Sequence, residues 1–235
     1  MIEAGLEFPH SARRLVMEAF LSLPEDLRPV RESVNEDDVG KEIKDHQRLV
    51  ETVSKRQTGL FLKGSHVTYD ISIAGTEPLM CSCFLEVEPA LVKHFMIHMA
   101  SARPIFGFAC APEEREWRNR ITAKQGVNSI ESWVGRHAQR YIPGLYWLTL
   151  LPTALAEKHG VSLPAVEGAA LEHIEIEGGQ HLFRFYEEPK DWRSAVGVGQ
   201  LCSSLPGIFD VQKVREQAAL ARNFLEFNEV VRNWK

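Results

Sequence analysis

The chain has 235 residues, of which 44% are hydrophobic and 25% are charged, which is an ordinary composition for a folded globular protein. Its 27 basic and 32 acidic side chains give a formal net charge of −5. This charge argues against a general nucleic-acid-binding protein, which needs a basic face to displace counterions, but it is compatible with a basic protein partner.

The N-terminal sequence does not resemble an export signal. MIEAGLEFPHSARR carries acids where a signal peptide has its basic region, and Glu18 interrupts the first apolar stretch. The four cysteines, Cys81, Cys83, Cys110 and Cys202, do not suggest a disulfide framework in a chain of this size. We therefore expect a cytoplasmic protein with reduced thiols.

Helical and strand periodicities follow one another along the first half of the chain. Apolar residues at helical spacing predict an amphipathic helix that ends at Pro24, and a second, polar helix is predicted over about 40–55. Strands are predicted at 59–64, 67–73 and 79–87, where alternate side chains share a face. Pro89 begins the next predicted helix, since proline is tolerated in a first helical turn.

In the second half, RPIFGFAC predicts a strand and Pro112 begins a short charged helix. Ser129 is predicted to cap a helix that continues through His137.

The C-terminal part contains a hairpin signal and a final helix. Gly178 and Gly179 separate LEHIEIE from HLFRFYE, and a two-residue turn of this kind needs positive φ at both positions. Asp210 is predicted to cap a helix whose apolar stripe runs from Val211 to Leu225.

These elements predict an α+β fold, with one or more antiparallel sheets flanked by amphipathic helices. The chain, 1–235, is expected to form one compact domain or two abutting α+β halves. Residues 1–60 are predicted to be an N-terminal helical region and residues 61–235 a sheet-containing body.

Motifs for metal binding and catalysis are incomplete. His94 and His98 have the spacing of zinc-binding histidines, but HFMIH lacks the glutamate that serves as general base in HExxH. Cys81 and Cys83 share a strand face but have no second pair of ligands at zinc-site spacing. We expect no metal, no cofactor and no enzymatic activity.

The charged helix after Pro112 carries alternating signs. Its charged side chains are Glu113, Glu114, Arg115, Glu116, Arg118 and Arg120. Such a run favours a solvated helix face with pairs four residues apart. A buried arginine–glutamate pair that ties this helix to the next one is the alternative.

YIPGLYWLTLLPTALAEKHG, at 141–160, is the most apolar and aromatic stretch. Its apolar run is about half the length of a membrane-spanning helix, and two prolines interrupt it. Most of it is predicted to be core, because exposed apolar patches of this size are rare. Tyr141, Tyr146 and Trp147 are the candidates for an aromatic that also anchors a partner at an interface rim.

This stretch resembles the signature of a bacterial family of type VI secretion immunity proteins, the immunity protein 52 group. The signature consists of an aromatic, a β-branched residue, Pro-Gly, further aromatics and a short helix. Here it is carried by Tyr141, Ile142, Pro143, Gly144, Tyr146 and Trp147. RPIFGFACAPEEREWRNR and LEHIEIEGGQHLFRFYEEP resemble the family's strand–helix segment and last strand pair, so the resemblance covers residues 70–225. Leu145 departs from it, because an aromatic often stands there.

The resemblance implies a protein made in the cytoplasm beside a toxin gene. Such a protein binds its secreted toxin stoichiometrically and performs no chemistry, and the toxin is commonly a nuclease. Neither a membrane nor direct contact with nucleic acid is expected.

Two acidic sets suit a basic nuclease, since acidic groups speed encounter with a basic surface. One set, in the N-terminal connector, is Glu32, Glu36, Asp37 and Asp38, and the other, around the hairpin, is Glu172, Glu175, Glu177, Glu187 and Glu188. Ordinary solvation is the competing interpretation of both. Glu175 and Glu177 are the first choice, because alternation places them on one strand face opposite Ile174 and Ile176.

An enzyme is the alternative function. His173, His181 and the glutamates of the 171–188 hairpin would then form an acid–base or metal cluster.

Overall fold

The computed structural model describes residues 1–55, 58–73, 78–125 and 128–234. Within these residues, ten strands form one antiparallel sheet in the order β11-β12-β10-β7-β1-β6-β5-β4-β2-β3, and β8 pairs with β9. The strands of the large sheet are β1 (Ile2–Phe8), β2 (Arg31–Ser33), β3 (Lys41–Glu42), β4 (Leu60–Lys63), β5 (Val67–Ser72), β6 (Leu79–Leu85), β7 (Phe106–Cys110), β10 (Leu148–Pro152), β11 (Glu172–Ile176) and β12 (Gln180–Arg184). The separate pair consists of β8 (Arg120–Gln125) and β9 (Asn128–Trp133).

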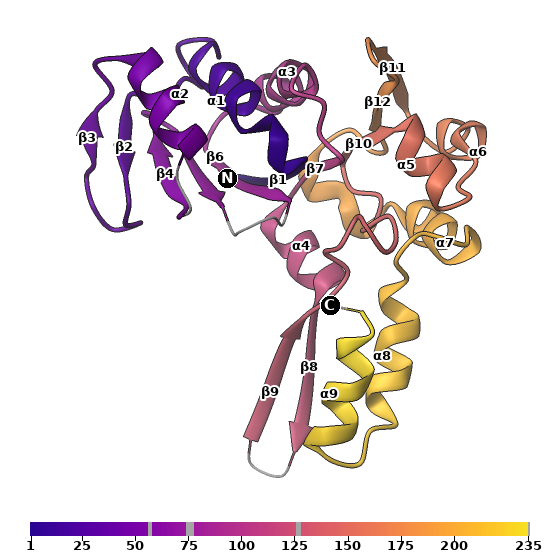
Figure 1. Cartoon of the computed structure of the whole chain (residues 1–235). Coiled ribbons are helices and arrows are strands. Elements are labelled where there is room, and N and C mark those ends of the chain that lie inside the picture. Colours follow the sequence, from indigo (N-terminus) through magenta and orange to yellow (C-terminus); the bar gives the residue numbers. More distant parts are fainter. Residues whose placement is uncertain (56–57, 74–77, 126–127, 235) are drawn as a thin grey trace.

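Helices cover both faces of the sheet, and the fold is α+β, as predicted. The helices are α1 (Arg13–Leu21), α2 (His46–Lys55), α3 (Pro89–Ala100), α4 (Pro112–Asn119), α5 (Thr153–Lys158), α6 (Leu163–Glu167), α7 (Val196–Ser204), α8 (Val211–Ala219) and α9 (Phe224–Arg232). Two short 3₁₀ helices are η1 (His10–Ala12) and η2 (Pro189–Arg193). Helices α1, α2 and α3 lie on one face, and α4 lies on the other (Figure 1).

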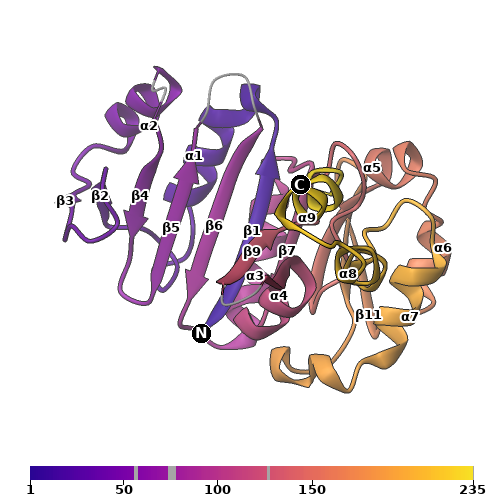
Figure 2. The same ribbon diagram turned by 90° about the horizontal axis from the view of Figure 1, so that it is seen from below.

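The N-terminal segment is a strand in the middle of the sheet. The region predicted as helical, 1–60, contains the two expected helices, α1 and α2, but also the unpredicted strands β1, β2 and β3. β1 pairs with β6 on one side and β7 on the other, and β2 and β3 form the far edge (Figure 2). The segment alternates with a period of two: Ile2, Ala4, Leu6 and Phe8 are buried. The intervening Glu3 and Glu7 have partners on the other face. Arg115 of α4 lies 3.7 Å from Glu3, and the Ala138 N–H donates to Glu7 Oε2 at 3.4 Å.

An aromatic cluster joins α1 and α3 to the sheet. The ring of Tyr69, on β5, lies 4.7 Å from that of Phe20 and 5.8 Å from that of Phe95. The Tyr69 hydroxyl donates to the Leu27 carbonyl at 2.6 Å, so the buried phenol keeps a hydrogen-bond partner. Cys81 and Cys83 of the adjacent β6 are buried free thiols, which confirms core packing for them.

An arm formed by β8, β9, α8 and α9 extends away from the sheet (Figure 1). It has its own hydrophobic cluster, which includes Ile121, Val214, Phe227 and Val231. The helix predicted from Ser129 is wrong, because Ser129 lies within β9 and pairs with β8. Hairpin pairing with a neighbouring strand therefore outweighs a local capping signal.

The final helix is confirmed at its start and wrong at its end. The Asp210 side chain accepts from the backbone N–H groups of Gln212 and Lys213, as an N-cap does. α8 ends at Ala219, however, and Asn223 caps a new helix, α9. Leu225 is consequently 73% exposed instead of part of the apolar stripe.

Helix α4 is largely buried on one side, so the predicted solvated face is wrong for Glu114, Arg115 and Arg118. Arg118 Nε donates to Glu114 Oε1 at 2.7 Å, and the Tyr186 hydroxyl donates to the same carboxyl group. Burial raises the pKa of Glu114 above its usual range, although Arg118 and Tyr186 act in the opposite direction. The buried Arg118–Glu114 pair lies within α4 and does not join α4 to the next helix. Tyr186 links this pair to the segment after β12.

Candidate functional site

The predicted hairpin exists, and its two glycines have the required geometry. β11 and β12 pair antiparallel, and φ is 83° at Gly178 and 72° at Gly179. β11 is the last strand of the sheet, so among the described strands its outer edge has no partner. Such an edge leaves backbone donors and acceptors open to another chain.

Three of the five hairpin acids are engaged within the chain. Glu172 accepts from Lys93 of α3 and lies 3.0 Å from Arg184 Nε, and the hydrogen bond from Lys93 lowers its pKa. Glu187 forms an ion pair with the same Arg184. Glu188 caps η2 in a reciprocal arrangement with Asp191.

Glu175 and Glu177 are exposed, and neither forms an ion pair with another described residue. Glu175 lies opposite His181 in the register, while Ile174 and Ile176 pack against the core. The alternation predicted for β11 therefore places Glu175 towards solvent. These two acids form the unneutralised part of the hairpin surface.

The other acidic set lies at the opposite end of the sheet. Glu36, Asp37 and Asp38 are exposed in the connection between β2 and β3, whereas β11 is at the other edge. The Lys63 ammonium donates to the Glu36 carbonyl and, at 2.6 Å, to the Asp38 carbonyl. Because eight strands lie between the edge strands β11 and β3, the two acidic sets face different parts of a partner.

Tyr146 and Trp147 are buried, so their proposed role as anchors at an interface rim is wrong. They are 0% and 2% exposed, and Tyr141 is 7% exposed. The Tyr146 hydroxyl donates to Asn119 Oδ1 at 2.9 Å, and Trp147 Nε1 donates to the Glu187 carbonyl at 3.3 Å. The apolar stretch continues into β10, between β7 and β12, which confirms the prediction of core.

Two histidines of the hairpin belong to a chain of hydrogen bonds. Thr153 Oγ1 lies 2.8 Å from His181 Nε2, His181 Nδ1 lies 3.0 Å from His173 Nε2, and His173 Nδ1 lies 3.2 Å from Glu167 Oε1. With one proton in each contact, every donor and acceptor in this chain has a partner. The Thr153 hydroxyl lies at one end of the chain and the Glu167 carboxylate at the other. The hairpin sequence indicates the two histidines but not Thr153 and Glu167, which lie in α5 and α6.

Burial and the neighbouring His173 lower the pKa of His181 below its usual 6.5. The unfolded chain therefore binds this proton more readily than the folded chain does. The stabilisation that neutral His181 contributes is complete above the pKa that His181 has in the unfolded chain. It is lost as the pH falls towards the lower pKa of His181 in the folded chain. We expect the free energy of unfolding to decrease between pH 8 and pH 5, as measured by urea denaturation.

His181→Asn should make this pH dependence shallower, whereas His66→Asn, at an exposed position, should leave it unchanged. Equal slopes for wild type and His181→Asn would contradict the assignment.

Among the described residues, no three His, Cys, Asp or Glu side chains gather as a metal site requires. His98 Nε2 lies 3.0 Å from the Ala19 carbonyl, and His94 is exposed on α3. In the described part of the chain, no helix has the length and apolarity to cross a bilayer.

Comparison with protein-family models, with curated proteins and with solved structures found no match.

Proposed function

We propose that this chain is a cytoplasmic immunity protein, which binds a cognate secreted antibacterial toxin and neutralises it without chemistry. The toxin would be a type VI effector with a basic surface, such as a nuclease, encoded by a neighbouring gene. The proposal is supported by the resemblance of the segment around Pro143-Gly144 and by the acidic edge of the sheet. The observation that supports the proposal most is that Glu175, on the edge strand β11, and Glu177, directly after it, are exposed and form no ion pair with a described residue.

The edge strand offers two complementary means of recognition. Backbone groups on the outer edge of β11 can pair with an extended segment of a partner, which gives affinity with little side-chain contact. Glu175 and the turn residue Glu177 add negative charge beside that edge, which favours a basic partner and speeds encounter. The backbone of β11 and of its turn is fixed by pairing with β12, so little backbone conformational entropy is lost on binding.

The test is charge reversal at the hairpin. We expect Glu175→Lys combined with Glu177→Lys to slow association with the neighbouring effector about tenfold at low salt, and to make the salt dependence shallower. The melting temperature should stay nearly unchanged, because both side chains are exposed. Association rates at two salt concentrations measure the effect.

The matched control is Glu36→Lys combined with Asp37→Lys, which changes the net charge equally at the other edge of the sheet. If both double variants slow association to the same degree, only net charge matters. If the hairpin variant associates as fast as wild type, β11 is not part of the interface and the β2–β3 connection becomes the candidate.

A second function is favoured by the hydrogen-bonded chain from Thr153 to Glu167. A hydroxyl hydrogen-bonded to an imidazole that a second group orients has the arrangement of an activated nucleophile. In such an enzyme the Thr153 proton would pass to His181, and Glu167 would stabilise the charge through His173. Covalent labelling of Thr153 by a fluorophosphonate would favour this function over toxin binding.

A further inference from the structure

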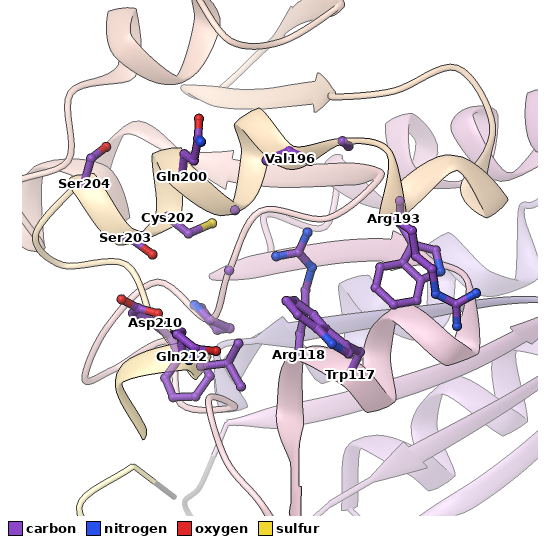
Figure 3. Close-up of a pocket in the computed structure, with 17 residues that line it drawn as sticks. Trp117, Arg118, Arg193, Val196, Gln200, Cys202, Ser203, Ser204, Asp210 and Gln212 are labelled. Carbon is purple, nitrogen blue, oxygen red and sulfur yellow. Dashed lines mark hydrogen bonds between the residues drawn. The ribbon is translucent and has the colours of Figure 1, made fainter. Parts of the chain in front are cut away.

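A cavity of about 730 Å³ lies where α4, η2, α7 and the start of α8 meet (Figure 3). Most of its lining is apolar, and it includes Trp117, Trp192, Val196, Phe209 and Val211. Cavities of this size are typical of sites for small molecules. None of the hairpin or connector acids lines it, so it is separate from the surface proposed for toxin binding.

Two tryptophans in contact with each other form one wall of the cavity. The rings of Trp117 and Trp192 lie 5.6 Å apart at an angle of 46°. The guanidinium of Arg215 lies 4.7 Å from the Trp117 ring centre, and that of Arg193 lies 4.6 Å from the Trp192 ring centre. These cation–π contacts hold the rings in place. Trp117 is nevertheless 45% exposed, which is unusual for so large an apolar side chain.

Arg118 projects from α4 into the cavity (Figure 3). It is only 8% exposed, and its single hydrogen bond to a described residue runs from Nε to Glu114. Both terminal Nη groups of Arg118 therefore lack a protein acceptor in the described part of the chain. They reach the cavity, and the planar fork of a guanidinium matches the oxygens of a carboxylate or sulfonate.

The charges in and beside the lining are balanced. Among the described residues that line the cavity, Arg118 and Arg193 are positive and Asp210 is negative. The Asp210 carboxylate already accepts two backbone N–H groups as the cap of α8. Glu114 balances Arg118, so an anion in the cavity would be held by hydrogen bonds from the Nη groups of Arg118 and not by a net positive charge.

We propose that this cavity binds a small organic anion with an apolar, ring-sized body. The body packs against the apolar lining, and the anionic oxygens accept hydrogen bonds from the Nη groups of Arg118. This site does not depend on the proposed toxin binding, which uses the β11 edge of the sheet.

Two glycines of α7 provide a variant that fills the cavity and a matched control that does not. A Cβ atom at Gly199 or Gly197 would meet no atom within 4 Å, but only Gly199 lines the cavity. Leucine at either position removes a helical glycine, so neither variant should lose stability. Gly199→Leu should occupy the cavity, whereas Gly197→Leu should leave it open.

Anilinonaphthalene sulfonate is the probe, because it combines an apolar ring system with an anionic group. We expect saturable binding by the wild type, followed by its fluorescence. Gly199→Leu should raise the dissociation constant by at least about tenfold, and Gly197→Leu should not change it. Melting curves of both variants check that they are folded.

The contribution of the charge is tested by changing the probe instead of Arg118, because loss of Arg118 would leave Glu114 buried without its partner. N-phenylnaphthylamine has the same ring system without the sulfonate. We expect it to bind about tenfold more weakly, because charge-assisted hydrogen bonds to Arg118 are lost. Equal affinity for the two probes would overturn the anion site. Equal binding of the sulfonate by both leucine variants would show that the cavity does not bind it.

Discussion

Glu114→Ala is expected to lower the free energy of unfolding by about 3–5 kcal/mol, because it leaves a buried cation without its partner. Glu114 is fully buried, and its carboxyl group accepts from Arg118 and from Tyr186. Alanine removes both acceptors at once. At roughly 2–4 °C per kcal/mol for a chain of this size, the melting temperature should fall by about 10 °C.

Two control variants separate charge from helix effects. Glu113→Ala changes the exposed neighbour in the same turn and should alter stability by no more than about 0.5 kcal/mol. Glu114→Gln keeps an oxygen acceptor but removes the charge, so its effect should lie between those of the two alanine variants. If Glu114→Ala melts within a degree or two of Glu113→Ala, the buried pair does not hold α4 in place.

The burial of α4 shows where sequence information ends. The pattern of alternating charges reports only that pairs can form four residues apart, and both solvated and buried helices satisfy it. The groups that bury Glu114 and Arg115 come from distant positions: Tyr186 follows β12, and Glu3 lies on β1. Which face a helix presents to the core therefore depends on contacts that local periodicity does not contain.

Features with a local chemical cause were predicted correctly. The positive φ angles at Gly178 and Gly179 and the capping of α8 by Asp210 each follow from a few adjacent residues. The strand at Ser129 was missed because its pairing with β8 is supplied by another segment.

In the candidate site, too, local features were predictable from the sequence and contacts between distant segments were not. The acids of the hairpin were identified from its sequence, and the exposure of Glu175 follows from strand alternation. That Glu172 is neutralised by Lys93 was not predictable, because the two are 79 residues apart. The cavity beside Arg118 gave no signal at all, since its lining comes from four separate elements.

Phe227→Ala should lower the free energy of unfolding by about 3–5 kcal/mol, whereas Leu225→Ala should change it by less than about 0.5 kcal/mol. Both residues lie in α9, two positions apart, and both variants place alanine in the same helix. Phe227 is fully buried in the hydrophobic cluster of the arm, and Leu225 is 73% exposed. Denaturation in urea, followed by circular dichroism, measures both.

The contrast depends on where α9 begins. A single helix continuing from Asp210 would carry its apolar stripe through Leu225, but α8 ends at Ala219, with Leu220 as its C-cap. The Asn223 side chain accepts from the N–H groups of Leu225 and Glu226, which starts a new helix with a new phase. Phe227 and Val231, four residues apart, then share the buried face. A larger loss of stability in Leu225→Ala than in Phe227→Ala would mean that the stripe continues from α8 and that this phase is wrong.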